Sequence, residues 1–295
     1  MVQSYGPVGA IAMQHTRNFQ KAVPLPPVSP PGLQSGSDDF ISPKALLESE
    51  GEFMAPEELA ELEKCHKVYY YGQFARCGSK IFDPPLFPNS RTGIFPFRMF
   101  AHMNFRYEII SGLGEGSFGH VVKAYDHKTK TFCAVKIVRS DPTILAQAEE
   151  ERKILRHLNK VSQKHHNVVQ LLDSFQFYGH LCFVFELQGD SLYDVLKKRN
   201  FKGLSLTAVR RIAHDVLKCL LLLSQENIVH TDLKPENILI NNHTRNKNQL
   251  LDCSLATLRT MTRFDVASPL PAITSQEVYN ATVIDFGCSD FVGKT

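Results

Sequence analysis

Several features that would assign a sequence to a class at once are missing from these 295 residues. There is no tryptophan, and the seven cysteines are scattered without a C-x-x-C pair, which argues against a zinc module and is typical of a reduced, intracellular protein. The first twenty residues lack the basic start and the apolar run of a signal peptide. Apolar runs such as residues 220–223 are far too short to span a bilayer.

A strong charge of either sign is missing as well. The net charge is +3 and the isoelectric point is about 8.4, too mild to predict a nucleic-acid or membrane partner. Apolar material is plentiful, with 43% hydrophobic residues and 20 phenylalanines. At this length the chain is expected to form two domains, or one large domain, around a substantial core.

The most informative stretch, residues 230–237, reads His-Thr-Asp-Leu-Lys-Pro-Glu-Asn. It supplies a carboxylate at Asp232, an amine at Lys234 and an amide at Asn237. These groups suit transfer of a metal-bound phosphoryl group, which needs a base near the attacking oxygen, cations on the transferred oxygens and a firm hold on the metal. A solvated polar loop is the alternative, and the partners elsewhere in the chain argue against it.

A glycine-rich turn lies between two predicted strands. Residues 107–113 and 121–125 have strand character, and Gly-Glu-Gly-Ser-Phe-Gly at 114–119 joins them. Glycines let the backbone approach phosphate oxygens and point its N–H groups at them. A dinucleotide-binding turn would lead into a helix, whereas β-branched residues follow here. The pattern therefore favours a phosphate lid on a hairpin.

Lys136 is the one charged residue in an apolar run, residues 132–138, that is predicted to be the next strand. A lysine that reaches from a strand edge into solvent is the alternative interpretation. Because this strand is expected to lie beside the lid, Lys136 would instead be within reach of phosphates under it.

A helix is predicted at about residues 143–158, with an apolar stripe at Leu145, Ala148, Leu155 and Leu158. It offers three consecutive acids as partners for Lys136: Glu149, Glu150 and Glu151. We favour Glu151 because Leu155 one turn later keeps that face inward, and Glu150 is the second choice. At least two of the three acids are expected to be exposed.

The rest of the second half is predicted to alternate helices and strands. A hairpin at 168–177 and 180–186 precedes a short helix at 190–198, a long helix at 206–224 and a strand at 238–240. The apolar stripe of the long helix is interpreted as core: Val209, Ile212, Ala213, Val216, Leu217 and Leu220. Residues 241–281 are interpreted as an inserted loop with a short helix at 250–261. A strand at 282–284 then delivers Asp285-Phe286-Gly287.

The first hundred residues are less patterned. Residues 1–40 are predicted to be a disordered leader, and the polyproline II stretch at 23–31 is a possible ligand for an aromatic groove of a partner. Ser42-Pro43 and Ala55-Pro56 are typical helix starts. Residues 68–72 have the character of a short strand. Residues 78–100 are interpreted as a loop laid over a hydrophobic surface.

Taken together, these motifs resemble a eukaryotic protein kinase. They are the lid, Ala134-Val135-Lys136, the helix glutamate, residues 230–237 and Asp285-Phe286-Gly287, in the order and on the elements expected of that family. Residues 123–128, 185–187, 191–193 and 200–203 further resemble the dual-specificity tyrosine-regulated kinases (DYRK, in the CMGC group), and residues 42–72 resemble the accessory region of their second class. The LAMMER kinases, which share the string at 230–237, are the alternative family.

The resemblance implies an α+β, bilobal kinase fold, with a five-stranded antiparallel N-lobe and an incomplete, mainly helical C-lobe. The implied domains are a leader at 1–40, the accessory region at 41–100, the N-lobe at 101–187 and a partial C-lobe at 188–295 that contains the insertion. No activation loop or peptide-binding segment follows Gly287, so the sequence is expected to be a truncated kinase.

For ATP, the resemblance implies a binding site shared by the lid and the connector between the lobes. Apolar side chains would sandwich the adenine: Leu113, Val121, Ala134 and Leu239. Phe185 would be the gatekeeper, and the backbone of Glu186 and Leu187 would hydrogen-bond the adenine edge. The phosphates would lie under the lid, which comprises Gly114, Glu115, Gly116, Ser117, Phe118 and Gly119.

For catalysis, the resemblance implies that Lys136, held by Glu151, grips the α- and β-phosphates. Asn237 and Asp285 would hold Mg²⁺. Asp232 would orient the substrate hydroxyl and accept its proton, while Lys234 would neutralise charge on the γ-phosphate, a pattern of Ser/Thr kinases.

The expected function is transfer of the ATP γ-phosphate to Ser/Thr hydroxyls of protein substrates. Thr231 stands where an arginine is usual, which fits DYRK-like kinases that autophosphorylate a loop tyrosine during synthesis. A truncated, inactive form that binds nucleotide or acts as a scaffold is the alternative. The cytoplasm, the nucleus or both are the expected location.

Overall fold

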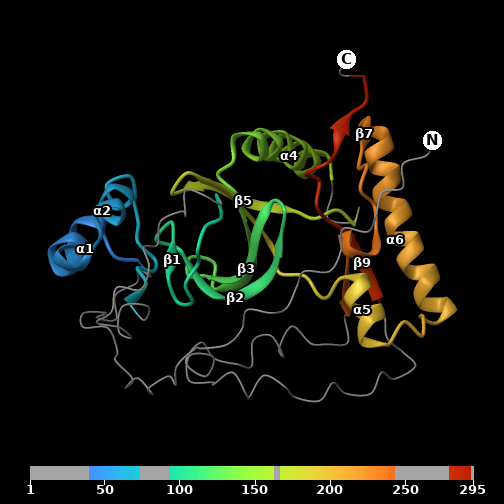
Figure 1. The fold of residues 1–295 in the computed structure, drawn as a ribbon, viewed down its shortest axis with the longest axis horizontal. Coiled ribbons are helices and arrows are strands. Elements are labelled where there is room, and N and C mark those ends of the chain that lie inside the picture. The colour runs from blue at the N-terminus through green and yellow to red at the C-terminus, as the bar shows by residue number, and fades with distance from the viewer. Residues whose placement is uncertain (1–39, 74–92, 163–166, 243–278, 294–295) are drawn as a thin grey trace, which may run out of the picture.

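The computed structural model describes residues 40–73, 93–162, 167–242 and 279–293 (Figure 1). Residues 1–39 of the predicted leader, residues 78–92 of the loop interpreted at 78–100 and the short helix at 250–261 lie outside these residues. Within the described part of the chain, no helix combines the length and the apolar character needed to cross a membrane. Its five cysteines are all free.

A six-stranded antiparallel sheet forms the centre of the molecule. In the order β1-β2-β3-β4-β6-β5, its strands are β1 (His102–Met103), β2 (Tyr107–Gly116), β3 (Gly119–Asp126), β4 (Thr131–Val138), β6 (His180–Glu186) and β5 (Leu171–Phe177). The α+β class is therefore confirmed, but five strands were expected. The additional strand, β1, has two residues, too few to show the alternation by which strands are recognised.

The two faces of the sheet carry different side chains, because neighbouring residues of a strand point to opposite faces. Val122, Val135 and Ile137 are buried in an apolar cluster on one face. Val121 and Lys136 are register partners on β3 and β4, and they therefore point to the other face. This second face is the one that carries the predicted nucleotide site.

Helix α4 (Pro142–Val161) begins where the sequence predicts a helix. The Asp141 side chain accepts hydrogen bonds from the backbone N–H groups of Thr143 and Ile144, and Pro142 occupies the first turn. One stripe of the helix is buried: Ala148, Glu151, Ile154, Leu155 and Leu158. A carboxylate is thus carried into the interior on an otherwise apolar stripe.

Beyond the sheet, the described part of the chain folds into helices and two short strand pairs at one end of the molecule (Figure 1). Its elements are α5 (Leu192–Lys198), α6 (Leu206–Gln225), β7 (Ile228–Val229), η2 (Pro235–Asn237), β8 (Ile238–Asn242), β9 (Tyr279–Val283) and β10 (Asp290–Phe291). Strand β8 pairs with β9, and β7 pairs with β10. Strands β8 and β9 extend into both ends of the segment that was interpreted as an insertion.

The prediction of the α6 core stripe was wrong in part. Ile212 is buried, but Val209, Ala213 and Leu217 are exposed. The side that faces the interior carries Ala208, Ile212, Asp215, Cys219, Leu222 and Leu223. The apolar side chains of α6 cover more than half of its circumference, so periodicity alone does not tell which stripe the neighbouring elements cover.

The accessory segment begins with α1 (Pro43–Glu50), η1 (Gly51–Phe53) and α2 (Pro56–Leu62). Both helix starts agree with the sequence, and the Ser42 hydroxyl caps α1 by accepting a hydrogen bond from the N–H of Ala45. The strand expected at residues 68–72 is absent among the described residues; Val68 makes only an isolated bridge with Ile41. The N–H groups of Tyr69 and Tyr70 both donate to the carbonyl of Phe105, which bends the backbone away from a ladder.

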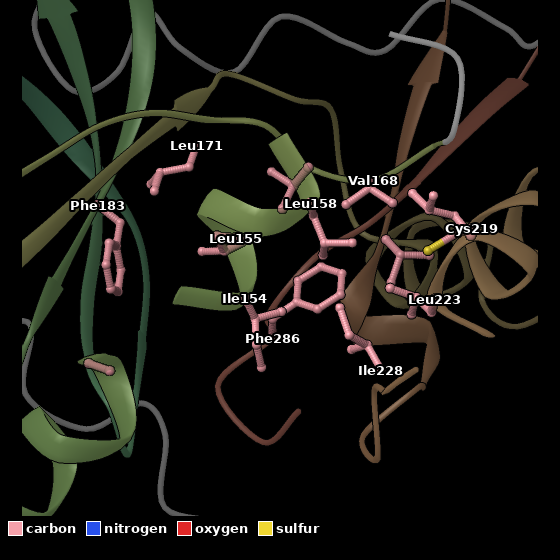
Figure 2. Packing of buried hydrophobic residues seen from close by; sticks show 14 of the residues in the cluster. Ile154, Leu155, Leu158, Val168, Leu171, Phe183, Cys219, Leu223, Ile228 and Phe286 are labelled. Atoms are coloured by element: carbon pink, nitrogen blue, oxygen red, sulfur yellow. The ribbon is translucent and has the colours of Figure 1, made fainter. Parts of the chain in front are cut away.

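One apolar cluster joins the sheet to the helices, and Phe286 lies within it (Figure 2). The ring is fully buried. Figure 2 shows it between Ile154 and Leu158 of α4 on one side and Leu223 and Ile228 on the other. The residue that follows Asp285 is therefore anchored in the main core.

Candidate functional site

The lid predicted from residues 114–119 is the tip of the β2–β3 hairpin. Gly116 pairs with Gly119, and Ser117 and Phe118 form the two-residue turn between them. Gly119 has a φ of 136°, and a Cβ there would lie 2.0 Å from the carbonyl oxygen of Ile137. Only glycine fits this position, because β3 crosses β4 in direct backbone contact.

Two other glycines of the lid stand beside open space. A Cβ built on Gly114 or Gly116 would meet no atom within 4 Å. The fold itself does not require glycine there, so the space is available for a ligand that approaches the backbone. Leu113, Glu115 and Ser117 are exposed around it. The lid therefore fits phosphate groups that contact main-chain N–H groups.

Lys136 forms the electrostatic centre of the candidate site. Its Nζ donates to both carboxylate oxygens of Glu151, at 2.8 and 2.9 Å, and to Oδ1 of Asp285 at 3.0 Å. The ring of Phe118, at the tip of the lid, lies 5.8 Å from the same Nζ. Four segments that are distant in sequence thus meet at one ammonium group.

The structure places Glu151, and neither of its two acidic neighbours, against Lys136. Glu149 pairs with Arg152, and Glu150 pairs with Lys153, on the outer side of α4. Glu151 is the acid on the buried stripe.

Burial and pairing act in opposite directions on these groups. Burial disfavours the charge of Lys136, but the adjacent carboxylates of Glu151 and Asp285 outweigh it and raise the lysine pKa. Burial also acts to raise the pKa of Asp285, yet Lys136 holds this pKa below its ordinary value. Burial raises the pKa of Glu151, and Lys136 opposes that increase. The lysine is therefore held as a cation, and Asp285 as an anion.

Two predicted catalytic residues, Asp232 and Lys234, lie close to the predicted metal ligand Asn237 in the stretch 230–237. Lys234 Nζ lies 2.8 Å from Oδ2 of Asp232, and the Asn237 amide donates to the same oxygen at 3.1 Å. The amide also donates to the carbonyl of Asp232 at 2.9 Å, which fixes the loop around the carboxylate. The hydrogen bond from Lys234 to Asp232 raises the pKa of the lysine.

Asn237 and Asp285, the predicted metal ligands, lie beside the paired strands β8 and β9, Asn237 just before β8 and Asp285 just after β9. The N–H of Ile284 donates to the carbonyl of Asn237 at 3.0 Å, next to the Ile238–Val283 register pair. Within the described residues there is no group of three or more His, Cys, Asp or Glu that could hold a metal. An amide and a carboxylate still suit Mg²⁺, which commonly takes one or two protein ligands together with phosphates and waters.

Most of the predicted adenine residues share the face of Lys136. Val121 pairs with Lys136, and Ala134 pairs with Phe185 on β6. Glu186 pairs with Cys133 at the end of β6, and Leu187 follows it. Leu113 precedes Gly114, the partner of Val121. Leu239 lies on β8, and its backbone forms an isolated bridge with Ser191, the residue just before α5.

The structure also contains a set of contacts that the sequence analysis did not predict, between the stretch 230–237 and the segment after Asp285. His230 Nε2 donates to the carbonyl of Ile284 at 3.0 Å, and the Thr231 hydroxyl donates to the carbonyl of Cys288 at 2.6 Å. Ser289 returns a hydrogen bond to the carbonyl of His230. Thr231 and Asp285 both have positive φ angles, 61° and 62°. No local sequence signal reveals such contacts, because their partners lie more than fifty positions apart.

In a comparison with known families, the protein kinase domain family matches residues 107–268. The match begins at β2 and includes the lid, Lys136, Glu151 and the stretch 230–237. It covers more than half of the chain.

Similar curated proteins carry matching names. "Dual specificity tyrosine-phosphorylation-regulated kinase 2" of Drosophila melanogaster is 38% identical over 222 residues, which are 72% of this chain and 30% of the fly protein. "Dual specificity tyrosine-phosphorylation-regulated kinase 3" of Homo sapiens is 42% identical over 152 residues, which are 51% of this chain and 26% of the human protein. The chain therefore spans less than a third of the length of these relatives.

Proposed function

This chain belongs to the protein kinase family and is DYRK-like, and from that premise we propose that it binds ATP and transfers the γ-phosphate to hydroxyl groups of proteins. The observation that carries the proposal is the contact of Lys136 with Glu151 and Asp285. It joins β4, α4 and the segment after β9 at the place where phosphates would bind. The similar proteins carry DYRK names and do not favour the LAMMER alternative.

We assign the nucleotide to the space between the lid and the second half of the chain. Val121, Ala134 and Leu113 would contact one side of the adenine, and Leu239 the other. Main-chain groups of Glu186 and Leu187 would bind its edge. Open space beside Gly114 and Gly116 supports phosphate binding to the lid backbone.

The chemical step would depend on three side chains of this chain. Asp232 would accept a hydrogen bond from the attacking hydroxyl and then its proton. Lys234 would balance the charge of the γ-phosphate, and Lys136 would orient the α- and β-phosphates. The protein would act mainly by orientation and by electrostatic stabilisation of the transition state.

The donor set fits a divalent cation of the Mg²⁺ type, held by Asn237 and Asp285. Held by these two residues, the ion would supply positive charge that offsets the negative charge of the phosphates during transfer. The negative charge of Asp285, which Lys136 maintains, is the form that can ligate the ion.

Finer assignments follow from the resemblance and belong to the same proposal. Lys234 supports Ser and Thr as the acceptors in protein substrates. Autophosphorylation on tyrosine, and activity in the cytoplasm or the nucleus, are proposed from the DYRK likeness alone.

The direct test is phosphate transfer from radiolabelled ATP to peptides that differ only in having Ser, Thr or Tyr at the acceptor position. We expect Mg²⁺-dependent labelling of the Ser and Thr peptides, with loss of at least about a hundredfold in Asp232→Asn because the base is removed. Asp190→Asn, an exposed carboxylate outside the site, is the matched control. Nucleotide binding without any transfer would support the inactive binding form instead.

A further inference from the structure

Residues 93–101 cross the sheet just before the region that matches the kinase family. We call this segment the strap. It contains three phenylalanines, Phe95, Phe97 and Phe100. Its contacts connect the start of α4, the lid hairpin and the edge of β2.

The first end of the strap is tied to the entrance of α4. The carbonyl of Gly93 accepts a hydrogen bond from the Ser140 N–H at 2.9 Å, and the Ser140 hydroxyl lies 3.4 Å from the same oxygen. Ser140 immediately precedes Asp141, which caps the helix that carries Glu151.

The middle of the strap is anchored in the core. Phe95 is buried and belongs to the apolar cluster that contains Val122 and Ile137. Its ring packs edge-on against Phe177 and His180, with centroid distances of 5.3 and 5.4 Å. The strap therefore runs over the face of the sheet opposite to Lys136.

Phe97 contacts the base of the lid. Its ring meets the ring of His120 edge-on, with centroids 5.6 Å apart. A Cβ on Gly112 would lie 3.3 Å from its Cζ, so the phenyl ring packs directly on the backbone of β2. His120 follows Gly119 at the end of the lid, and Gly112 lies two residues before Gly114. One ring thus contacts both strands of the hairpin.

The second end of the strap is held by main-chain hydrogen bonds. The N–H of Phe100 donates to the carbonyl of Ile109 at 2.7 Å, and the N–H of Ile109 donates to the carbonyl of Ala101 at 3.0 Å. The Tyr70 hydroxyl, from the accessory segment, donates to the carbonyl of Phe100 at 2.6 Å. Phe97 is consequently fixed between two anchored points.

We propose that the strap is a backstop for the lid and that Phe97 is a positioning residue for nucleotide binding. A lid that moves away from Lys136 must move toward the strap face, where the ring of Phe97 opposes it. The strap would therefore favour the closed lid and place the lid backbone over the phosphates. The effect on nucleotide affinity rests on the proposed function, whereas the effect on lid motion does not.

The test of lid motion is hydrogen–deuterium exchange of peptides that cover residues 112–120 in the full chain. Phe97→Ala should accelerate exchange of the lid amides, because it removes the contact with His120 and Gly112. Met99→Ala is the matched control, since Met99 is an exposed apolar residue of the same strap. His120→Ala removes the same contact from the other side and should act alike, and the double variant should add little. If Phe97→Ala does not fold, His120→Ala alone decides whether this contact restrains the lid.

The test of positioning is the dissociation constant of a fluorescent ATP analogue with Mg²⁺. Phe97→Ala should weaken binding by about two- to tenfold, the range expected for loss of one aromatic pair. Phe97→Tyr keeps the aromatic ring and should retain the wild-type affinity. Met99→Ala, the control, should leave the affinity unchanged. Faster lid exchange in both Phe97→Ala and His120→Ala supports the backstop. Unchanged lid exchange in a folded variant overturns it. If the wild-type chain binds no nucleotide, the proposed function fails while the exchange experiment still decides the backstop.

Discussion

Lys136 Nζ lies within hydrogen-bonding distance of three carboxylate oxygens, and one of its partners, Glu151, has only 4% of its surface exposed. A buried carboxylate is tolerated only when it is paired, because transfer of an unpaired charge out of water is costly. Lys136 is therefore expected to contribute both to the stability of the fold and to nucleotide binding. Substitutions of Lys136 and Glu151 separate the two contributions.

Lys136→Met should lower the free energy of unfolding by about 3–5 kcal/mol near neutral pH, because it leaves the carboxylate of Glu151 unpaired. The loss should shrink as the pH falls, since protonation removes the buried charge. Adding Glu151→Gln should recover much of the stability and abolish this pH dependence, but it should not recover ATP binding. Urea unfolding at several pH values and ATP titration of the wild type and the two variants check this. Full ATP affinity in Lys136→Met would contradict the assignment of the lysine to the phosphates.

Asp126 gives a pH prediction outside the site. Burial acts to raise its pKa, but hydrogen bonds from Arg106 at 2.8 and 2.7 Å outweigh burial and lower the pKa below its ordinary value of 3.8. A lowered pKa in the folded state stabilises the fold above pH 3.8, and this stabilisation is lost as the pH falls through the folded-state pKa.

Asp126→Asn should therefore cost about 1.5–3 kcal/mol of unfolding free energy near pH 7, the range for hydrogen bonds to charged groups. The difference from the wild type should decrease toward zero below pH 3.8. Urea unfolding between neutral pH and pH 3 measures it. Asp190→Asn, which removes an exposed pair with Lys198, is the control and should change stability by less than about 1 kcal/mol. An equal difference at all pH values would exclude the Arg106 pairing as its source.

At the scale of the elements, the lid hairpin contains two kinds of glycine. Gly119 is required by the fold, whereas Gly114 is expected to be required only by a ligand. Gly119→Ala should destabilise the chain by more than about 1 kcal/mol, because its Cβ would collide with the carbonyl of Ile137 and its φ is positive. Gly114→Ala should leave stability nearly unchanged, since no atom lies within 4 Å of its Cβ, but it should weaken ATP binding. Thermal unfolding and ATP titration measure the two effects. Unaltered ATP affinity in Gly114→Ala would show that phosphates do not approach that part of the lid.

Helix α6 allows the same substitution to be compared on two sides. Leu222→Ala should cost about 2–5 kcal/mol, because Leu222 is 4% exposed and packs in the main core. Leu217→Ala should change stability by less than about 0.5 kcal/mol, because its side chain is 63% exposed. Urea unfolding of the two variants compares them. Equal costs would mean that the outer stripe is covered in solution.

These elements also show how far the sequence alone could lead. A local rule, an acid on the inward stripe of a helix, points from Lys136 to Glu151 fifteen positions later. The contact of Lys136 with Asp285 spans 149 positions and has no local signal. The outer stripe of α6 looks like core because hydrophobic periodicity reports what a helix can bury and not what its neighbours cover. Strand β1 was missed because two residues carry no period.

At the scale of the whole molecule, the main cluster connects the sheet, α4 and α6 through Phe286. Phe286→Ala should lower the free energy of unfolding by about 3–5 kcal/mol, because it opens a cavity between the two halves. The position of Asp285 would shift with it, so ATP affinity should fall as well. Chemical denaturation followed by far-ultraviolet circular dichroism measures the stability. Phe201→Ala, at a side chain that is 61% exposed, is the control and should have little effect. A similarly small effect in Phe286→Ala would contradict its place in the core.

The pairing of β8 with β9 has a consequence for how such a chain can vary. The chain leaves the hairpin at Asn242 and re-enters it at Tyr279, and these two residues are register partners. The distance that any intervening sequence must close is therefore constant, and the entropy of loop closure rises only slowly with length. Residues 243–278 can therefore be replaced by a shorter segment, a longer one or one that carries a reporter. The distance in space between Asn237 and Asp285 should stay the same in each case.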